Sequence, residues 1–229
     1  AISKARGQVS ELIGAQKADE IVFTSGGTES NNLAIIGAAY RNVSKGNHIV
    51  TSSIEHMSVL NACKYLSKQG FEITYLPVDK YGMVDLHALE KAISEKTILV
   101  SVMYGNGEIG TIEPIKEIGE NVRSKDIIFH VDGVAVAGQI PIDVKKDDID
   151  LLSLSSNDMY GPRGIGALYI KSGTRIQPIF YGGGQERGLR SGTENLTGIV
   201  GMGKAAEIAK AEMSIESARL VRLRDRFIE

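Results

Sequence analysis

Short apolar runs alternate along the chain with longer segments in which apolar residues recur every three to four positions. The runs predict β-strands, and the longer segments predict amphipathic α-helices. The predicted strands are residues 21–24, 49–52, 73–77, 98–103, 127–131 and 151–155. The predicted helices are residues 28–40, 57–69, 86–93 and 115–122. Strands that alternate with helices in this way are typical of an α/β fold with a mainly parallel sheet.

The pattern changes after Gly164. Two strand-like runs, residues 166–170 and 178–181, are joined by a turn and predict an antiparallel edge of the sheet. A long helix is predicted from about Ile199 onward, and the alternating charges of residues 215–229 indicate that its later part runs over the surface. No linker or repeat divides the chain, so we expect residues 1–229 to form one domain.

The composition is that of a globular domain with one substantial core. Of 229 residues 42% are hydrophobic, and 26 Lys and Arg residues stand against 28 Asp and Glu residues, for a formal net charge of -2. This balance excludes extended disorder and gives no electrostatic reason to expect nucleic acid or an anionic membrane as a partner. No apolar run approaches the roughly 20 residues that span a bilayer, and no secretory signal is recognisable, so a cytoplasmic location is predicted. Because the chain begins without Met and ends in a charged helical stretch, we expect a piece of a longer protein.

A small, polar segment, residues 24–32, follows the first predicted strand and precedes the first predicted helix. Its glycines expose backbone N–H groups. With a helix amino terminus behind it and the Thr28 hydroxyl at its mouth, the segment is suited to cradle a phosphate. The alternative is an ordinary turn with Thr28 as the helix cap. The segment alone leaves both interpretations open.

Three further strands are followed by polar residues. Asp132 ends one, His56 follows another and opens a helix, and Ser155 ends a third before a glycine-proline turn. Ligands of open parallel sheets gather at the carboxyl ends of the strands, so these side chains are expected to share an edge with Gly27. The alternatives are structural roles, a turn cap for Asp132 and an ordinary structural histidine for His56.

The glycine-rich segment 181–193 contains Arg187 and Arg190 and is interpreted as a loop that closes on an anion. The single cysteine, Cys63, lies at helical spacing with apolar residues and is interpreted as a core residue rather than a nucleophile. It has no second cysteine to pair with, which fits a reducing compartment. The histidines show no metal-ligand spacing, so no metal site is predicted.

In this order, the segments resemble the pyridoxal-phosphate (PLP) dependent cysteine desulfurases of NifS/IscS type, a branch of the fold-type I, aminotransferase class V-like enzymes. The resemblance covers nearly the whole chain, and its most specific parts are residues 23–34, 55–56, 150–155, 160–169 and 182–195. It implies that residues 1–229 form the large, PLP-binding domain, with a mainly parallel seven-stranded sheet between helices. It also implies a homodimer with sites at the subunit interface. The family's small C-terminal domain, with its catalytic cysteine loop and substrate-binding arginine, would lie beyond Glu229.

The resemblance implies a role for individual residues as well. Those matched to the cofactor phosphate are Gly27, Thr28, Ser155 and Thr193, the last reaching the phosphate of the partner subunit. His56 would stack on the pyridine ring. Asp132 would pair with the ring nitrogen, because a carboxylate there keeps the nitrogen protonated and lets the ring accept electrons.

The departures from the family pattern concern the reactive end of the cofactor. Asn157 and Asp158 stand where the family has a His-Lys pair, so the Schiff-base lysine is missing. A carboxylate cannot form an imine with an aldehyde. Two contacts on the side of the cofactor's 3′ oxygen are also altered, with Gly107 in place of Asn and Ala135 in place of Gln. Asn157 retains an amide that can donate to the phosphate in place of the lost histidine.

The missing lysine decides the predicted function. Loss of a positioned base alone typically costs about 10²–10⁴-fold in rate. We predict a cysteine desulfurase-family protein of iron–sulfur cluster assembly with noncovalent PLP, L-cysteine as family substrate, an IscU-type scaffold protein as partner, and weak or absent activity of its own. With abundant sulfide, such a protein can instead act as an assembly scaffold. The rivals are an active desulfurase that uses free PLP and another fold-type I enzyme, such as a transaminase or selenocysteine lyase.

Overall fold

The computed structural model describes all 229 residues. The strands are β1 (Ile21–Thr24), β2 (His48–Ser52), β3 (Glu72–Leu76), β4 (Thr97–Met103), β5 (Ile128–Asp132), β6 (Leu151–Ser155) and β7 (Gly166–Ile170). The α-helices are α1 (Ile2–Leu12), α2 (Gly27–Asn42), α3 (Met57–Lys68), α4 (Leu86–Ala92), α5 (Ile115–Arg123) and α6 (Leu196–Ile228). Short 3-10 helices span Ala18–Glu20, Asn157–Met159 and Glu186–Gly188.

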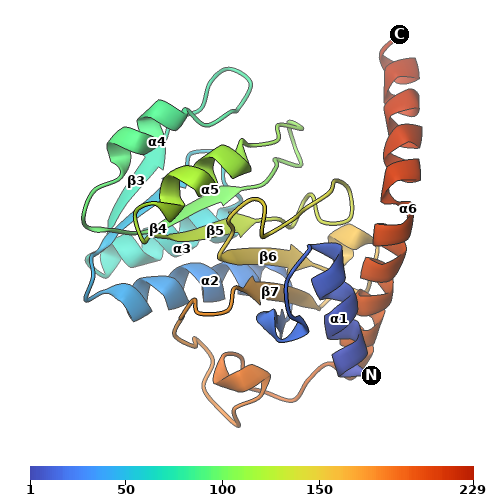
Figure 1. Cartoon of the computed structure of the whole chain (residues 1–229), viewed down its shortest axis with the longest axis horizontal. Coiled ribbons are helices and arrows are strands. Elements are labelled where there is room, and N and C mark those ends of the chain that lie inside the picture. The colour runs from blue at the N-terminus through green and yellow to red at the C-terminus, as the bar shows by residue number, and fades with distance from the viewer.

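Helices cover both faces of the single sheet (Figure 1). Helices α2 and α3 pack on one face around residues such as Leu33. Helices α1, α4, α5 and α6 pack on the other, around residues such as Ile118. Successive strand residues point to opposite faces, so Leu151 belongs to the first core and Leu152 to the second. Burial of both faces explains the nearly continuous apolar runs and confirms the predicted α/β fold.

The strand order is β1-β7-β6-β5-β4-β2-β3. Strands β2 to β6 pair in parallel, whereas β7 is antiparallel to both β1 and β6, which confirms a mainly parallel seven-stranded sheet with an antiparallel strand at one end. The predicted strand at residues 178–181 is wrong. Only an isolated bridge joins Phe180 to Arg190 there. Pro178 has no N–H to give to a ladder, and the preceding Gln177 donates its N–H to Gly37 of α2 instead.

Helix α6 begins at Leu196, slightly before its predicted start, and its first half packs into the core through Met202. Its second half extends past the body of the molecule and leaves Phe227 exposed, as the charge pattern predicts (Figure 1). Helix α1 has no counterpart among the predicted helices, although Val9 and Leu12 place an apolar stripe against the core. No helix combines the length and the apolar character needed to cross a membrane.

Candidate active site

The carboxyl ends of β2, β4, β5 and β6 and the start of α2 surround a pocket of about 540 Å³. Six of the eight predicted site residues line it, namely Gly27, Thr28, His56, Asp132, Ser155 and Asp158. Gly107 and Ala135 line it as well. The other two predicted residues, Asn157 and Thr193, do not line this pocket. The expected gathering of polar strand ends at one sheet edge is therefore present in the structure.

One end of the pocket is the amino terminus of α2. The cap position is Gly26, and no side chain caps the helix, so the interpretation of Thr28 as an ordinary cap is wrong. The N–H groups of a helix's first turn have no partner within the helix and favour an anion. A Cβ atom on Gly27 would lie 2.5 Å from Cγ2 of Val134, so any larger residue would have to displace the Val134 side chain. With Ser155 on the same pocket wall, this end suits a phosphate group.

Asp132 lies deeper in the pocket and is 5% exposed. Its Oδ1 accepts the Val134 N–H at 3.0 Å, and its Oδ2 accepts the Asn31 side-chain amide at 2.7 Å. Burial raises the pKa of Asp132, the two hydrogen bonds and the nearby His56 oppose the rise, and the charge of Asp158 adds to it. A cationic N–H on a ligand would restore the charge balance, so this carboxylate fits a protonated pyridine nitrogen.

His56 is held by a chain of hydrogen bonds that ends at Asp132. The same Asn31 amide nitrogen donates to Ser58 Oγ at 2.8 Å, and Ser58 Oγ lies 2.7 Å from His56 Nδ1. His56 Nδ1 also accepts the Ser58 N–H at 3.2 Å and thereby caps α3. Because Nδ1 is an acceptor, the proton of the neutral ring lies on Nε2. The ring is exposed and borders the pocket.

Sequence reasoning missed Asn31 and Ser58 as site residues. Both are buried and line the pocket, and the Oδ1 atom of Asn31 is buried without a hydrogen-bond partner. An orphaned polar atom of this kind calls for a ligand or water donor. The available signal was the placement of Asn31 on the buried face of α2, among apolar residues such as Ala34 and Ile35.

Glu55 ties two strand ends together behind His56. Its carboxylate is 4% exposed, and Oε1 accepts hydrogen bonds from Ser52 Oγ at 2.6 Å and from the Met103 N–H at 2.8 Å. Oε2 has no partner. Burial raises the pKa of Glu55 to about 8, against the effect of the two hydrogen bonds. The side chain therefore joins the end of β2 to the end of β4 in a mostly protonated state at neutral pH.

Asp158 follows β6 in the 3-10 helix Asn157–Met159 and is half-buried. Its carboxylate makes no hydrogen bond or ion pair within the chain; only its backbone oxygen accepts a contact, from Gln139 at 3.5 Å. None of the residues that line the pocket is a lysine or an arginine. On the facing wall, a Cβ atom on Gly107 would lie 3.4 Å from Ala135 Cβ, so the two other departures from the family pattern are neighbours.

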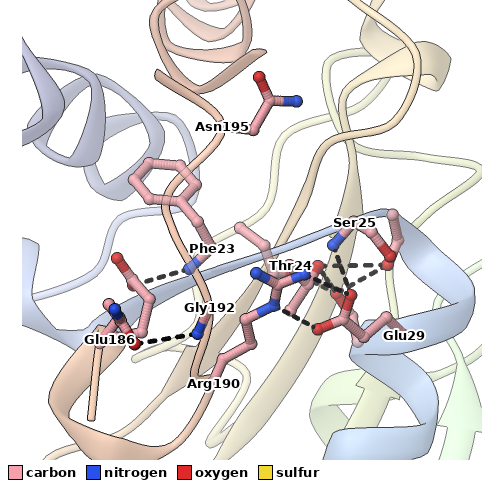
Figure 2. A network of polar contacts seen from close by, with 12 residues as sticks. Phe23, Thr24, Ser25, Glu29, Glu186, Arg190, Gly192 and Asn195 are labelled. Atoms are coloured by element: carbon pink, nitrogen blue, oxygen red, sulfur yellow. Dashed lines mark hydrogen bonds and ion pairs between the residues drawn. The ribbon is translucent and has the colours of Figure 1, made fainter. Parts of the chain in front are cut away.

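The glycine-rich loop is anchored to α1 and α2 by two ion pairs, and Figure 2 shows the one with α2. Glu186 accepts two hydrogen bonds from Arg6, each at 2.7 Å, and its side chain is 4% exposed. Arg190 Nε donates to Glu29 Oε1 at 2.9 Å, and Glu29 also accepts the Ser25 N–H. Arg190 therefore forms an ion pair with a carboxylate of its own chain. The expectation that the loop's arginines face an external anion is wrong for Arg190.

The two predicted residues outside the pocket are both exposed. Asn157 accepts a hydrogen bond from Arg163 Nε at 3.2 Å through its Oδ1. Thr193 makes no side-chain hydrogen bond within the chain. Cys63, by contrast, is fully buried on α3, where burial raises its pKa to about 12, which confirms it as a core residue. No three histidine, cysteine or carboxylate side chains are arranged to hold a metal ion.

Known proteins are similar to this chain in sequence and in fold. The model of the family "Aminotransferase class-V" matches residues 1–226. Cysteine desulfurase IscS 1 of Archaeoglobus fulgidus is 60% identical over 228 residues, which cover 100% of this chain and 59% of that protein. Cysteine desulfurase IscS of Methanosarcina thermophila is 57% identical over 229 residues, which cover 100% of this chain and 56% of that protein.

Solved structures agree. A NifS-like protein has a TM-score of 0.96 and 42% identity, over 99% of this chain and 62% of that one. The structure described as SspA in complex with cysteine has a TM-score of 0.87 and 44% identity, over 90% of this chain and 60% of that one. The chain spans less than two thirds of the length of each of these relatives. It belongs to the aminotransferase class-V family, within the NifS/IscS-type cysteine desulfurases, whose cofactor is PLP.

Proposed function

We propose that the chain is the PLP-binding large domain of a cysteine desulfurase-family protein of iron–sulfur cluster assembly whose own desulfurase activity is weak or absent. The observation that carries this proposal is the unpartnered carboxylate of Asp158 in a pocket that no lysine lines. The relatives named as cysteine desulfurases support the family function. A cytoplasmic location and a small C-terminal domain outside residues 1–229 belong to the same proposal.

The residues around the pocket fit the cofactor at both ends. Gly27, Thr28 and Ser155 would hold the phosphate at the start of α2, and Asp132 would receive the protonated ring nitrogen. The hydrogen bonds through Ser58 hold the His56 ring at the mouth of the pocket. When bound, PLP supplies an electron-accepting ring that stabilises negative charge at a substrate carbon. Asp158 can accept a proton, but it cannot tether the cofactor.

The proposal extends to a homodimer. A hollow of about 720 Å³ lies beside the pocket and shares Thr28, His56 and Ser58 with it. Its rim carries exposed Tyr65 and Tyr181, which a second copy of the chain would cover. Thr193, exposed and outside its own pocket, would then reach the partner's phosphate site. L-cysteine as substrate and an IscU-type scaffold as partner rest on the family alone.

Cofactor retention tests the proposal directly. Purified protein loaded with PLP is dialysed against phosphate buffer, and a second sample is first reduced with borohydride and analysed by mass spectrometry. We expect the native protein to lose the cofactor and to carry no lysine-linked adduct near the site. Asp158→Lys, combined with Asn157→His, should gain such an adduct, because the phosphate end of the pocket is complete.

Asp158→Asn is the matched control, since it removes the charge without supplying an amine, and it should show no adduct. A lysine-linked adduct in the native protein would contradict the proposal and favour an active desulfurase. If the Lys variant binds PLP but forms no covalent bond, Gly107 and Ala135 limit the site more than Asp158 does.

A further inference from the structure

We infer that the pocket selects pyridoxamine 5′-phosphate, the form of the cofactor with a cationic amine, over the forms that carry an uncharged aldehyde or hydroxymethyl group on the same carbon. Asp158 makes the selection. This inference rests on the proposed function in one respect: the pocket must bind the phosphate and ring that all these forms share. It concerns the substituent on the ring carbon that carries the aldehyde in PLP.

The pocket carries an excess of negative charge. Its lining includes the carboxyl groups of Glu108, Asp132 and Asp158, beside the mostly protonated Glu55, and no lysine or arginine. His56 is the one basic side chain among the lining residues. A phosphate dianion brings still more negative charge, and the start of α2 offers it only partial positive charge. A ligand that carries its own ammonium group reduces this imbalance, whereas an aldehyde or a hydroxymethyl group does not.

The carboxylate oxygens of Asp158 are free to accept hydrogen bonds from a ligand. Both oxygens of Asp132 already accept hydrogen bonds inside the chain, and Glu55 is held by Ser52 and Met103. The Asp158 carboxylate has no such partner, although it is half-buried in the pocket wall. A half-buried carboxylate gains most from a ligand that donates charged N–H groups.

The length of the Asp158 side chain also suits an ion pair with the ligand. Asp158 occupies the position at which the family's lysine bonds to the cofactor carbon. Aspartate is shorter than lysine, but a charge-assisted N–H···O hydrogen bond of about 2.8 Å makes up most of the missing length. The position that suits a covalent bond from lysine therefore also suits an ion pair between aspartate and an amine on the same carbon.

The test compares three ligands by isothermal titration calorimetry at pH 7 and low salt: pyridoxamine, pyridoxine and pyridoxal 5′-phosphates. Pyridoxine 5′-phosphate is the decisive comparison, because its hydroxymethyl group is uncharged. Unlike the aldehyde of pyridoxal 5′-phosphate, it forms no imine with any lysine of the protein. We expect pyridoxamine 5′-phosphate to bind about tenfold more tightly than pyridoxine 5′-phosphate. This is the effect of one hydrogen bond between charged groups that solvent partly screens. Asp158→Asn should abolish the preference without weakening the binding of pyridoxine 5′-phosphate, since it removes only a negative charge from the pocket.

Glu108→Gln is the matched control, since it removes an exposed carboxylate from the same pocket and should keep most of the preference. Equal affinities in the native protein would overturn the inference while leaving the proposed cofactor site intact. The same holds if the preference persists in Asp158→Asn. If none of the three phosphates binds, the proposed function fails together with the inference.

Discussion

Glu55 shows how one side chain can link the fold to the solution pH. It is buried at the junction of β2 and β4, with both of its donors on one oxygen and none on the other. Its pKa is raised to about 8, so the folded protein holds a proton that the unfolded chain releases near pH 4.5. Between these two values the folded state binds more protons, and the free energy of unfolding must fall as the pH rises.

We therefore predict that Glu55→Gln removes a pH-dependent part of the stability. Relative to the variant, the native protein should lose up to about 1.4 kcal/mol of unfolding free energy per pH unit between pH 5 and 8. Urea denaturation of both proteins across this range measures the difference. Parallel pH profiles would show that Glu55 titrates normally, and Glu108→Gln, which changes an exposed carboxylate, should leave the native slope unchanged.

At the residue scale, the sequence was informative where chemistry follows a strand end. Gly27, Asp132 and Ser155 could be placed at one edge because strand direction alone brings them there. Asn31 and Ser58 could not, since each lies inside a helix and its role depends on which neighbour it faces. That pairing is set by how α2 packs beside α3, a tertiary contact that no local pattern encodes.

At the scale of elements, the glycine-rich loop depends on one ion pair. Glu186 accepts two hydrogen bonds from Arg6 and a third, at 2.9 Å, from the Phe23 N–H of β1. The Glu186 side chain therefore fixes the loop to α1 and to β1 at once, and Figure 2 shows its contact with Phe23 of β1. Removing it would leave the Arg6 guanidinium, whose side chain is 19% exposed, without its counter-ion.

Glu186→Ala should destabilise the protein by about 3 kcal/mol, since it breaks a largely buried pair and strands one charge. Urea unfolding gives the magnitude, and limited proteolysis should show earlier cleavage within residues 182–193. Glu194→Ala, in the same stretch but with no side-chain hydrogen bond or ion pair, is the matched control. A loss of less than about 1 kcal/mol would show that the pair is screened as a surface contact.

The predictable elements were those with a long periodic pattern. Every predicted helix between the strands is present, because its apolar stripe must face the sheet. The strand predicted at residues 178–181 is absent, although the run is apolar enough for a strand. The chain is held against α2 at Gln177, and only an isolated bridge forms beyond it. In this segment the apolar pattern predicted neither pairing nor burial, since Phe180 is 49% exposed and Tyr181 is 74% exposed.

At the scale of the whole molecule, the proposed dimer makes Thr193 a test of the shared site. A hydroxyl bonded to a dianionic phosphate contributes about 1.5–3 kcal/mol, so Thr193→Val should weaken PLP binding by roughly 10–150-fold. The dimer itself should persist, because only one hydroxyl is removed. Calorimetric titration beside sedimentation velocity measures both. Thr197→Val, at the start of α6, should change neither; a native monomer that binds PLP fully would rule out the shared site.

The antiparallel strand β7 also has a consequence for the order in which the molecule can be assembled on the ribosome. Strand β1 has no other partner in the sheet, and its Ile21 pairs with Tyr169. The strand that leads into the proposed phosphate-binding turn is therefore synthesised early. At about 5–20 residues per second, its neighbour follows on the order of 10 s later. Until then Thr24 and Ser155 cannot be brought to either side of Gly166. We therefore expect the site to be completed late in synthesis, and the β1 edge to stay without its partner until β7 has emerged.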